Sequence, residues 1–176
     1  MFKIPPIFKN QQFLRLWLNQ MFLQVGFNVC NYTVLLILAD RTHSPFVQAQ
    51  FFAALTLPAF VFGLIAGPIV DMVNRKKLML ISNMILALLF LTYVIADYSL
   101  ITFAIIAFLT SSTARFFIPA QAATIPLIVG KETLHFANAL FLFTLMGSVI
   151  LGYSIASPII EIFGGLGSNG ELAPFL

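Results

Sequence analysis

Five long, uninterrupted apolar segments constrain this chain more than any other feature of its sequence. A membrane-spanning helix needs about 20 apolar residues to cross a hydrocarbon core about 30 Å thick. All five segments reach this length, and none alternates between polar and apolar residues as a lipid-facing β-strand does. The expected spans are roughly Phe13–Ala39, Phe46–Val70, Leu78–Ala96, Leu100–Ala122 and Asn138–Phe163. The sequence therefore predicts an all-α membrane protein with five transmembrane helices.

The composition agrees with a membrane protein and argues against several other classes. Hydrophobic residues make up 60% of the chain and charged residues 9%, whereas charged residues make up about 25% of an average soluble domain. No basic patch interleaved with aromatic residues indicates nucleic-acid binding, so we expect a lipid bilayer as partner and no nucleic acid. Motifs such as HExxH, GxSxG, CxxC and the P-loop are absent, and His43 and His135 lie in opposite linkers. We therefore expect no enzyme, no metal site and no cofactor.

The positions of the basic residues predict how the chain is oriented in the membrane. If the N-terminus lies inside, eight of the nine lysines and arginines fall on the same side as it does, and Arg41 alone falls outside. The eight are Lys3, Lys9, Arg15, Arg75, Lys76, Lys77, Arg115 and Lys131. Positive residues mark the cytoplasmic side of membrane proteins. We expect a multi-pass protein of the inner or plasma membrane with a cytoplasmic N-terminus.

The chain divides into three parts on this basis. Residues 1–12 form a cytoplasmic segment that lies along the membrane interface, and residues 13–163 form the five-span domain. Residues 164–176 are expected to form an extracytoplasmic loop and the truncated start of a sixth span. Pro174 suits a first helical position, and an apolar run opens after it.

Four amides form a polar stripe along the first predicted span. At 100° per residue, the side chains of Gln20, Gln24, Asn28 and Asn31 fall within an arc of about 80°. Polar groups are costly in lipid, so such a stripe has one of two explanations. Either it lines a transport pathway or cavity, or it makes hydrogen bonds that hold neighbouring helices together. The sequence leaves both open.

Small residues recur at every fourth position in two of the spans. They are Ala59, Gly63 and Gly67 in the second span, and Ser148, Gly152 and Ala156 in the fifth. Small residues at this spacing let the backbones of membrane helices approach closely. We therefore expect each of the two stripes to pack against a neighbouring helix; the alternative is that these faces are where helices slide during a conformational cycle.

The linker between the second and third spans concentrates charge in a few residues. It reads GPIVDMVNRKK from Gly67 to Lys77. Arg115 lies about 22 Å along the predicted fourth span, which places it near the cytoplasmic end. A cation at this depth needs a partner, and Asp71 is the acid within reach. We expect an Asp71–Arg115 ion pair; the alternative is that Arg115 extends to the lipid headgroups.

This linker resembles the signature G-x-x-x-D-[RK]-x-G-x-[RK]-[RK] of the major facilitator superfamily. The matching positions are Gly67, Asp71, Lys76 and Lys77, and Arg75 adds to the charge. Met72 stands where a cation is usual and Asn74 where a glycine is usual. Asparagine tolerates a left-handed backbone, so the turn can form. The segments FLRLWLNQ (13–20) and ARFFIPAQAATIPLIVGKETLHFANAL (114–140) resemble the branch of bacterial siderophore and macrolide exporters.

The resemblance implies part of a six-helix transporter half that works by alternating access, built of inverted three-helix repeats. It implies export of a small amphipathic molecule, with Gln20, Gln24, Asn28 and Asn31 along the pathway. It also implies a cytoplasmic gate, formed by Gly67, Asp71, Arg75, Lys76, Lys77 and Arg115. The partners would be the small-molecule substrate and a missing C-terminal half. The alternatives are a membrane assembly module that does not transport, and a half-transporter that acts as a dimer.

Overall fold

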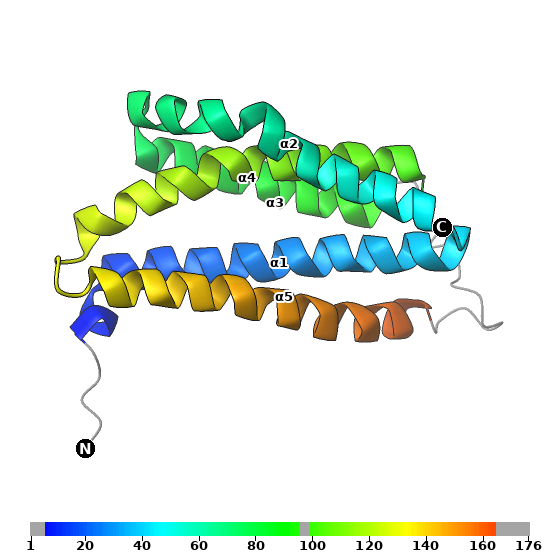
Figure 1. Cartoon of the computed structure of the whole chain (residues 1–176). Coiled ribbons are helices and arrows are strands. Elements are labelled where there is room, and N and C mark those ends of the chain that lie inside the picture. Colours follow the sequence, from blue (N-terminus) through cyan, green and yellow to red (C-terminus); the bar gives the residue numbers. More distant parts are fainter. Residues whose placement is uncertain (1–5, 96–98, 165–176) are drawn as a thin grey trace, which may run out of the picture.

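The described part of the chain is a bundle of helices. The computed structural model describes residues 6–95 and 99–164, and all regular structure in these ranges is helical. A short 3₁₀ helix, η1 (Pro6–Lys9), precedes five α-helices, each long and apolar enough to cross a membrane (Figure 1). They are α1 (Gln11–Thr42), α2 (Pro45–Met72), α3 (Arg75–Ile95), α4 (Leu100–Ile128) and α5 (Leu134–Gly164). The prediction of five spans is confirmed, while the loop and sixth-span start predicted beyond Gly164 lie outside the described residues.

The helices pack in two groups. The first helix, α1, lies along α5, while α4 lies between α2 and α3 and packs against both (Figure 1). Contacts between the α1–α5 pair and the α2–α3–α4 group are much sparser. Helix α5 therefore packs on α1, the most distant helix in the sequence, rather than on α4, which precedes it in the sequence.

One end of the bundle carries most of its positive charge. The start of α1, the α2–α3 turn and the α4–α5 turn lie together at this end (Figure 1). The described cations in these segments are Lys9, Arg15, Arg75, Lys76, Lys77 and Lys131. We call it the basic end. The α1–α2 turn, with Asp40 and Arg41 just before it, lies at the opposite end.

Two apolar clusters join the α1–α5 pair to the other group, one near each end. At the basic end, the buried residues are Ile7, Phe13, Ile125, Val129 and Ala137. At the opposite end, they are Val34, Leu38, Phe51, Phe103 and Ala107. Side-chain amides also link the α1–α5 pair to the α2–α3–α4 group. Asn83 Nδ2 donates to Asn19 Oδ1 at 3.0 Å, and Gln121 Nε2 donates to the Leu16 carbonyl at 3.4 Å.

The two stripes of small residues behave differently. In α5, Ser148 is 2% exposed and Ala156 fully buried. A Cβ added at Gly152, between them, would lie only 2.6 Å from Asn28 Cβ, so this stripe does pack closely on α1. In α2, a Cβ at Gly63 or Gly67 would meet nothing within 4 Å. The expectation of a close approach at these two glycines is therefore wrong, because their face of α2 packs on no described helix.

Candidate functional site

The α2–α3 turn is short and is fixed by a side-chain cap. Helix α2 ends at Met72 and α3 begins at Arg75. Asn74 Oδ1 accepts a hydrogen bond from the backbone N–H of Lys77 at 3.1 Å, which satisfies one of the free amides at the start of a helix. Asn74 does not adopt the left-handed backbone that the sequence suggested, since His43 is the only described non-glycine residue with positive φ. An asparagine suits this position because it caps α3.

Arg75 connects three helices at the basic end. Its Nη2 lies 3.1 Å from Asp71 Oδ1 on α2, and its Nη1 donates to the Ala123 carbonyl on α4 at 3.2 Å. We call this arrangement the Arg75 bridge. The Asp71 side chain is 70% exposed, and an exposed ion pair adds at most about 1 kcal/mol. The bridge therefore matters more for geometry than for stability, since it fixes the α2–α3 turn against α4.

The other predicted gate residues of this linker surround the bridge without joining it. Lys76 and Lys77 are exposed, and Gly67 lies one turn before Asp71 on an open face of α2. Met72, at the position where the family signature has a cation, is 85% exposed. The sequence thus located the turn correctly, and the structure gathers its charge interactions on Arg75.

Arg115 does not belong to this cluster, which corrects two expectations. Helix α4 runs on to Ile128 through Pro119 and Pro126, so Arg115 has 15 helical residues before it and 13 after it. It therefore lies near mid-helix, about 20 Å from either end. The Arg75 bridge contacts α4 at Ala123, about 12 Å along the helix axis from Arg115. Asp71, which lies at the bridge, is therefore too far away to reach Arg115. The predicted Asp71–Arg115 pair is wrong, and Asp71 pairs with Arg75 instead.

The surroundings of Arg115 leave part of its guanidinium without a partner. Its Nε is buried and has no hydrogen-bond partner, and the residue makes no ion pair within the described ranges. A charged group at such a depth in a membrane helix is costly and commonly marks a substrate or ion pathway. Arg115 is the one described cation located near the middle of a span.

The side chains of the four amides in the α1 stripe differ in their hydrogen-bond partners. Gln20 Nε2 donates to the Phe141 carbonyl of α5 at 3.4 Å, and Asn28 Nδ2 donates to Ser148 Oγ at 2.9 Å. Asn31 is buried, and its Oδ1 accepts from Tyr93 Oη of α3 at 3.3 Å. Gln24 is half-buried, and its backbone carbonyl accepts a hydrogen bond from Asn28 Nδ2 at 2.9 Å, in addition to the bond that Asn28 makes to Ser148. In this structure, three of the four side chains make hydrogen bonds between helices.

Sequence reasoning missed the aromatic pair beside these amides. The rings of Tyr32 and Tyr153 stack with centroids 3.6 Å apart and an angle of 25° between their planes. The pair lies next to Gly152, whose lack of a side chain lets α1 and α5 approach. A further contact along the same boundary is the bond from Trp17 Nε1 to Thr144 Oγ1, at 2.8 Å. We call the boundary formed by Asn28, Tyr32, Ser148, Gly152 and Tyr153 the α1–α5 seam.

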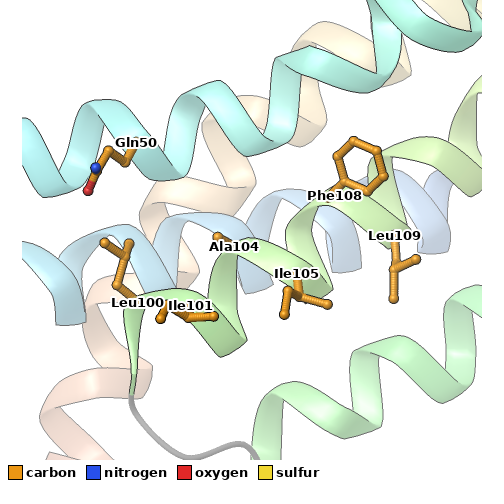
Figure 2. A pocket seen from close by; sticks show the side chains of 7 residues that line it. All are labelled: Gln50, Leu100, Ile101, Ala104, Ile105, Phe108 and Leu109. Carbon is orange, nitrogen blue, oxygen red and sulfur yellow. The ribbon is translucent and has the colours of Figure 1, made fainter.

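An apolar groove of about 400 Å³ runs along the first part of α4. Figure 2 shows its lining, which consists of Gln50 from α2 and six α4 residues between Leu100 and Leu109. None of these residues is charged, and the groove lies near the end opposite the Arg75 bridge. The groove offers no acid, base or nucleophile. No cluster of acidic, histidine or cysteine side chains within residues 6–95 and 99–164 could hold a metal ion.

These observations define a class of protein. Five membrane-length helices define a polytopic membrane protein, and an arginine inside the fourth helix is a feature that commonly marks a substrate or ion pathway. The family model described as "Transmembrane secretion effector" matches residues 4–167. The chain therefore belongs to this family of the major facilitator superfamily, as its motifs predicted.

One curated relative supports the same assignment. The chain is 30% identical over 154 residues to the "Uncharacterized MFS-type transporter YkuC" of Bacillus subtilis (strain 168). The match covers 85% of this chain and 35% of that protein, so the chain spans about a third of the length of the relative it matches. No solved structure matches the chain.

Proposed function

We propose that this chain is the N-terminal part of a secondary transporter that exports small molecules by alternating access. Membership of the superfamily supports transport across a membrane. The gathering of cations at the basic end supports a cytoplasmic location for that end and for the N-terminus. In this proposal, the C-terminal transporter half, which is not part of the sequence described, faces the bundle and completes the substrate site.

The observation that carries the proposal is the Arg75 bridge. It ties the α2–α3 turn to α4 at the Ala123 carbonyl. The exposed Asp71 carboxylate has further lone pairs available for a donor from a facing helix. We assign Asp71, Arg75, Lys76 and Lys77 to a cytoplasmic gate that closes when such a donor engages Asp71, with Gly67 on the open helix face beside it.

We assign Arg115 to the transport pathway rather than to the gate. Its depth in α4 and its unpartnered Nε support a role in meeting an anionic group of the substrate or a coupled acid. The amides Gln20, Gln24, Asn28 and Asn31 remain part of the proposed pathway. Gln24 is the best placed of them, because the side chains of the other three already bond to other helices.

Asp71→Asn in the full-length transporter tests the gate. We expect it to change the rate of dye transport severalfold in proteoliposomes, with ethidium as a cationic probe and carboxyfluorescein as an anionic one. It should also change how fast a cysteine placed at Val73, in the α2–α3 turn, reacts with a maleimide. Asp40→Asn is the matched control, since it makes the same chemical change at the opposite end and should behave as the parent protein.

The same preparations separate this proposal from its rivals. If Asp71→Asn leaves both transport and cysteine reactivity unchanged, the gate assignment fails. Transport by vesicles that contain only this chain would instead indicate a half-transporter acting as a dimer. A folded full-length protein that moves neither dye and shows no change in cysteine reactivity would indicate a membrane assembly module.

A further inference from the structure

A single side chain, Asn10, caps two helices. Its Oδ1 accepts from the backbone N–H groups of Gln12 at 3.0 Å and Phe13 at 3.2 Å, at the start of α1. Its Nδ2 donates to the carbonyl of Ile128, the last residue of α4, at 2.6 Å. Free N–H groups at a helix start and free carbonyls at a helix end both need partners. The two halves of one amide supply one partner of each kind.

The residues around Asn10 hold it against the bundle. Ile7 of η1 is 3% exposed and packs with Phe13, Ile125 and Ala137. The ring of Phe8 meets those of Trp17 and Phe136 edge to face, each at 6.1 Å between centroids. Residues 7–13 thus cross from α1 to the ends of α4 and α5. We call this segment the N-terminal strap.

The strap and the Arg75 bridge hold the same part of α4. Arg75 binds the Ala123 carbonyl and Asn10 binds the Ile128 carbonyl, five residues further on. These two points are about 7.5 Å apart along the helix axis and about 140° apart around it. The last turns of α4 are therefore held from two sides, by the α2–α3 turn and by the start of α1.

We propose that Asn10 is a positioning residue that fixes the basic end of α4 relative to α1. The α1–α5 pair and the α2–α3–α4 group touch sparsely along their length. At the basic end, this bond, the apolar cluster beneath it and the bond from Gln121 to the Leu16 carbonyl set how the two groups meet. The consequence for gating rests on the proposed function. Because the end of α4 is held to α1, the Ala123 carbonyl that Arg75 binds keeps a fixed position relative to α1.

Substitutions at Asn10 separate the two roles of the amide. Asn10→Asp keeps an acceptor for the N–H groups at the start of α1, where a negative charge is also favourable. It removes the donor to Ile128 and brings a carboxylate close to that carbonyl. Asn10→Ser also keeps the cap but is too short to reach Ile128. Asn10→Ala loses both roles.

Distance measurements between two spin labels test the proposal without any need for transport. The labels are placed at Gln12→Cys and Lys131→Cys, both exposed positions, in the full-length protein with Cys30→Ser. With Asn10 present, we expect a narrow distance distribution. Asn10→Asp and Asn10→Ser should lose this narrow peak while keeping the unfolding midpoint near that of the parent, whereas Asn10→Ala should lose the peak and lower the midpoint.

The outcomes are distinct from those that test the gate. If Asn10→Asp and Asn10→Ser both keep the narrow peak, the positioning role is refuted, whatever Asp71→Asn does to transport. If they lose the peak while Asp71→Asn has no effect, Asn10 positions α4 but the gate lies elsewhere. If Asn10→Ala alone lowers the midpoint and all three variants keep the narrow peak, Asn10 serves only as a helix cap and the proposal is overturned.

Discussion

The α1–α5 seam predicts a large effect of a very small substitution, Gly152→Ala. The added Cβ would lie 2.6 Å from Asn28 Cβ, 3.0 Å from Tyr32 Cδ2 and 3.1 Å from the Asn28 carbonyl carbon. One of these atoms is backbone and another is the first side-chain carbon, so rotating a side chain cannot relieve the overlap. Ordinary contact begins at 3.4 Å, so the helices must separate locally by about 0.8 Å, the difference from 2.6 Å.

That separation would have a cost from two sources. Inserting an extra methyl group into a packed contact typically destabilises a protein by about 1–3 kcal/mol. A shift of about 0.8 Å would also stretch the 2.9 Å bond from Asn28 to Ser148 beyond hydrogen-bonding range, at about 0.6 kcal/mol for an average bond between membrane helices. The higher helix preference of alanine offsets about 0.5–1 kcal/mol of this cost. We therefore expect Gly152→Ala to lower the free energy of unfolding by about 1–3 kcal/mol.

Gly147→Ala is the matched control, because it lies in the same helix with nothing within 4 Å of the new methyl group. Replacing a helical glycine with alanine where there is space favours the helix by about 0.5–1 kcal/mol. Unfolding of both variants can be followed by circular dichroism in mixed micelles with increasing SDS. If Gly152→Ala proves as stable as Gly147→Ala, the helices do not approach as closely as described, and the reasoning about the seam fails.

Two more substitutions test the seam and the proposed pathway. Thr144→Val removes the acceptor of the Trp17 indole N–H. Because Trp17 is the only tryptophan, the fluorescence emission of the protein should shift to shorter wavelength. The control Thr113→Val alters a hydroxyl that is bonded within α4 and should leave the emission spectrum unchanged. Arg115→Gln removes a cation near the middle of a span; it should raise stability by up to about 3 kcal/mol, from the cost of arginine at a helix centre, and abolish transport by the full-length protein. Unchanged transport would remove Arg115 from the pathway.

The sequence was sufficient for features that depend on local composition. The five spans follow from the length of each apolar run, and the basic turn between α2 and α3 follows from its cluster of charged residues. The small-residue stripe of α5 also gave a correct prediction. The same pattern in α2 did not, because spacing shows that helices can approach closely but not whether a helix lies there.

Errors arose where the outcome depends on helix length and on distant partners. We expected the fourth span to end near Ala122; its continuation through Pro126 to Ile128 moved Arg115 away from the basic end and out of reach of Asp71. Asn10 showed no sign of its second role, since the carbonyl that it binds is 118 residues away. Periodicity within one helix shows which residues share a face but does not identify the helix that covers it.

The packing of α1 on α5 also bears on how the chain is made. Asn28 bonds to Ser148, which is 120 residues further along the chain. Ribosomes add about 5–20 residues per second, so roughly 6–24 s pass between the synthesis of these two residues. During that time the bond from α1 to Ser148 has no partner to form with. Helix α1 is thus made early but acquires its full set of polar contacts only after α5 has been synthesised.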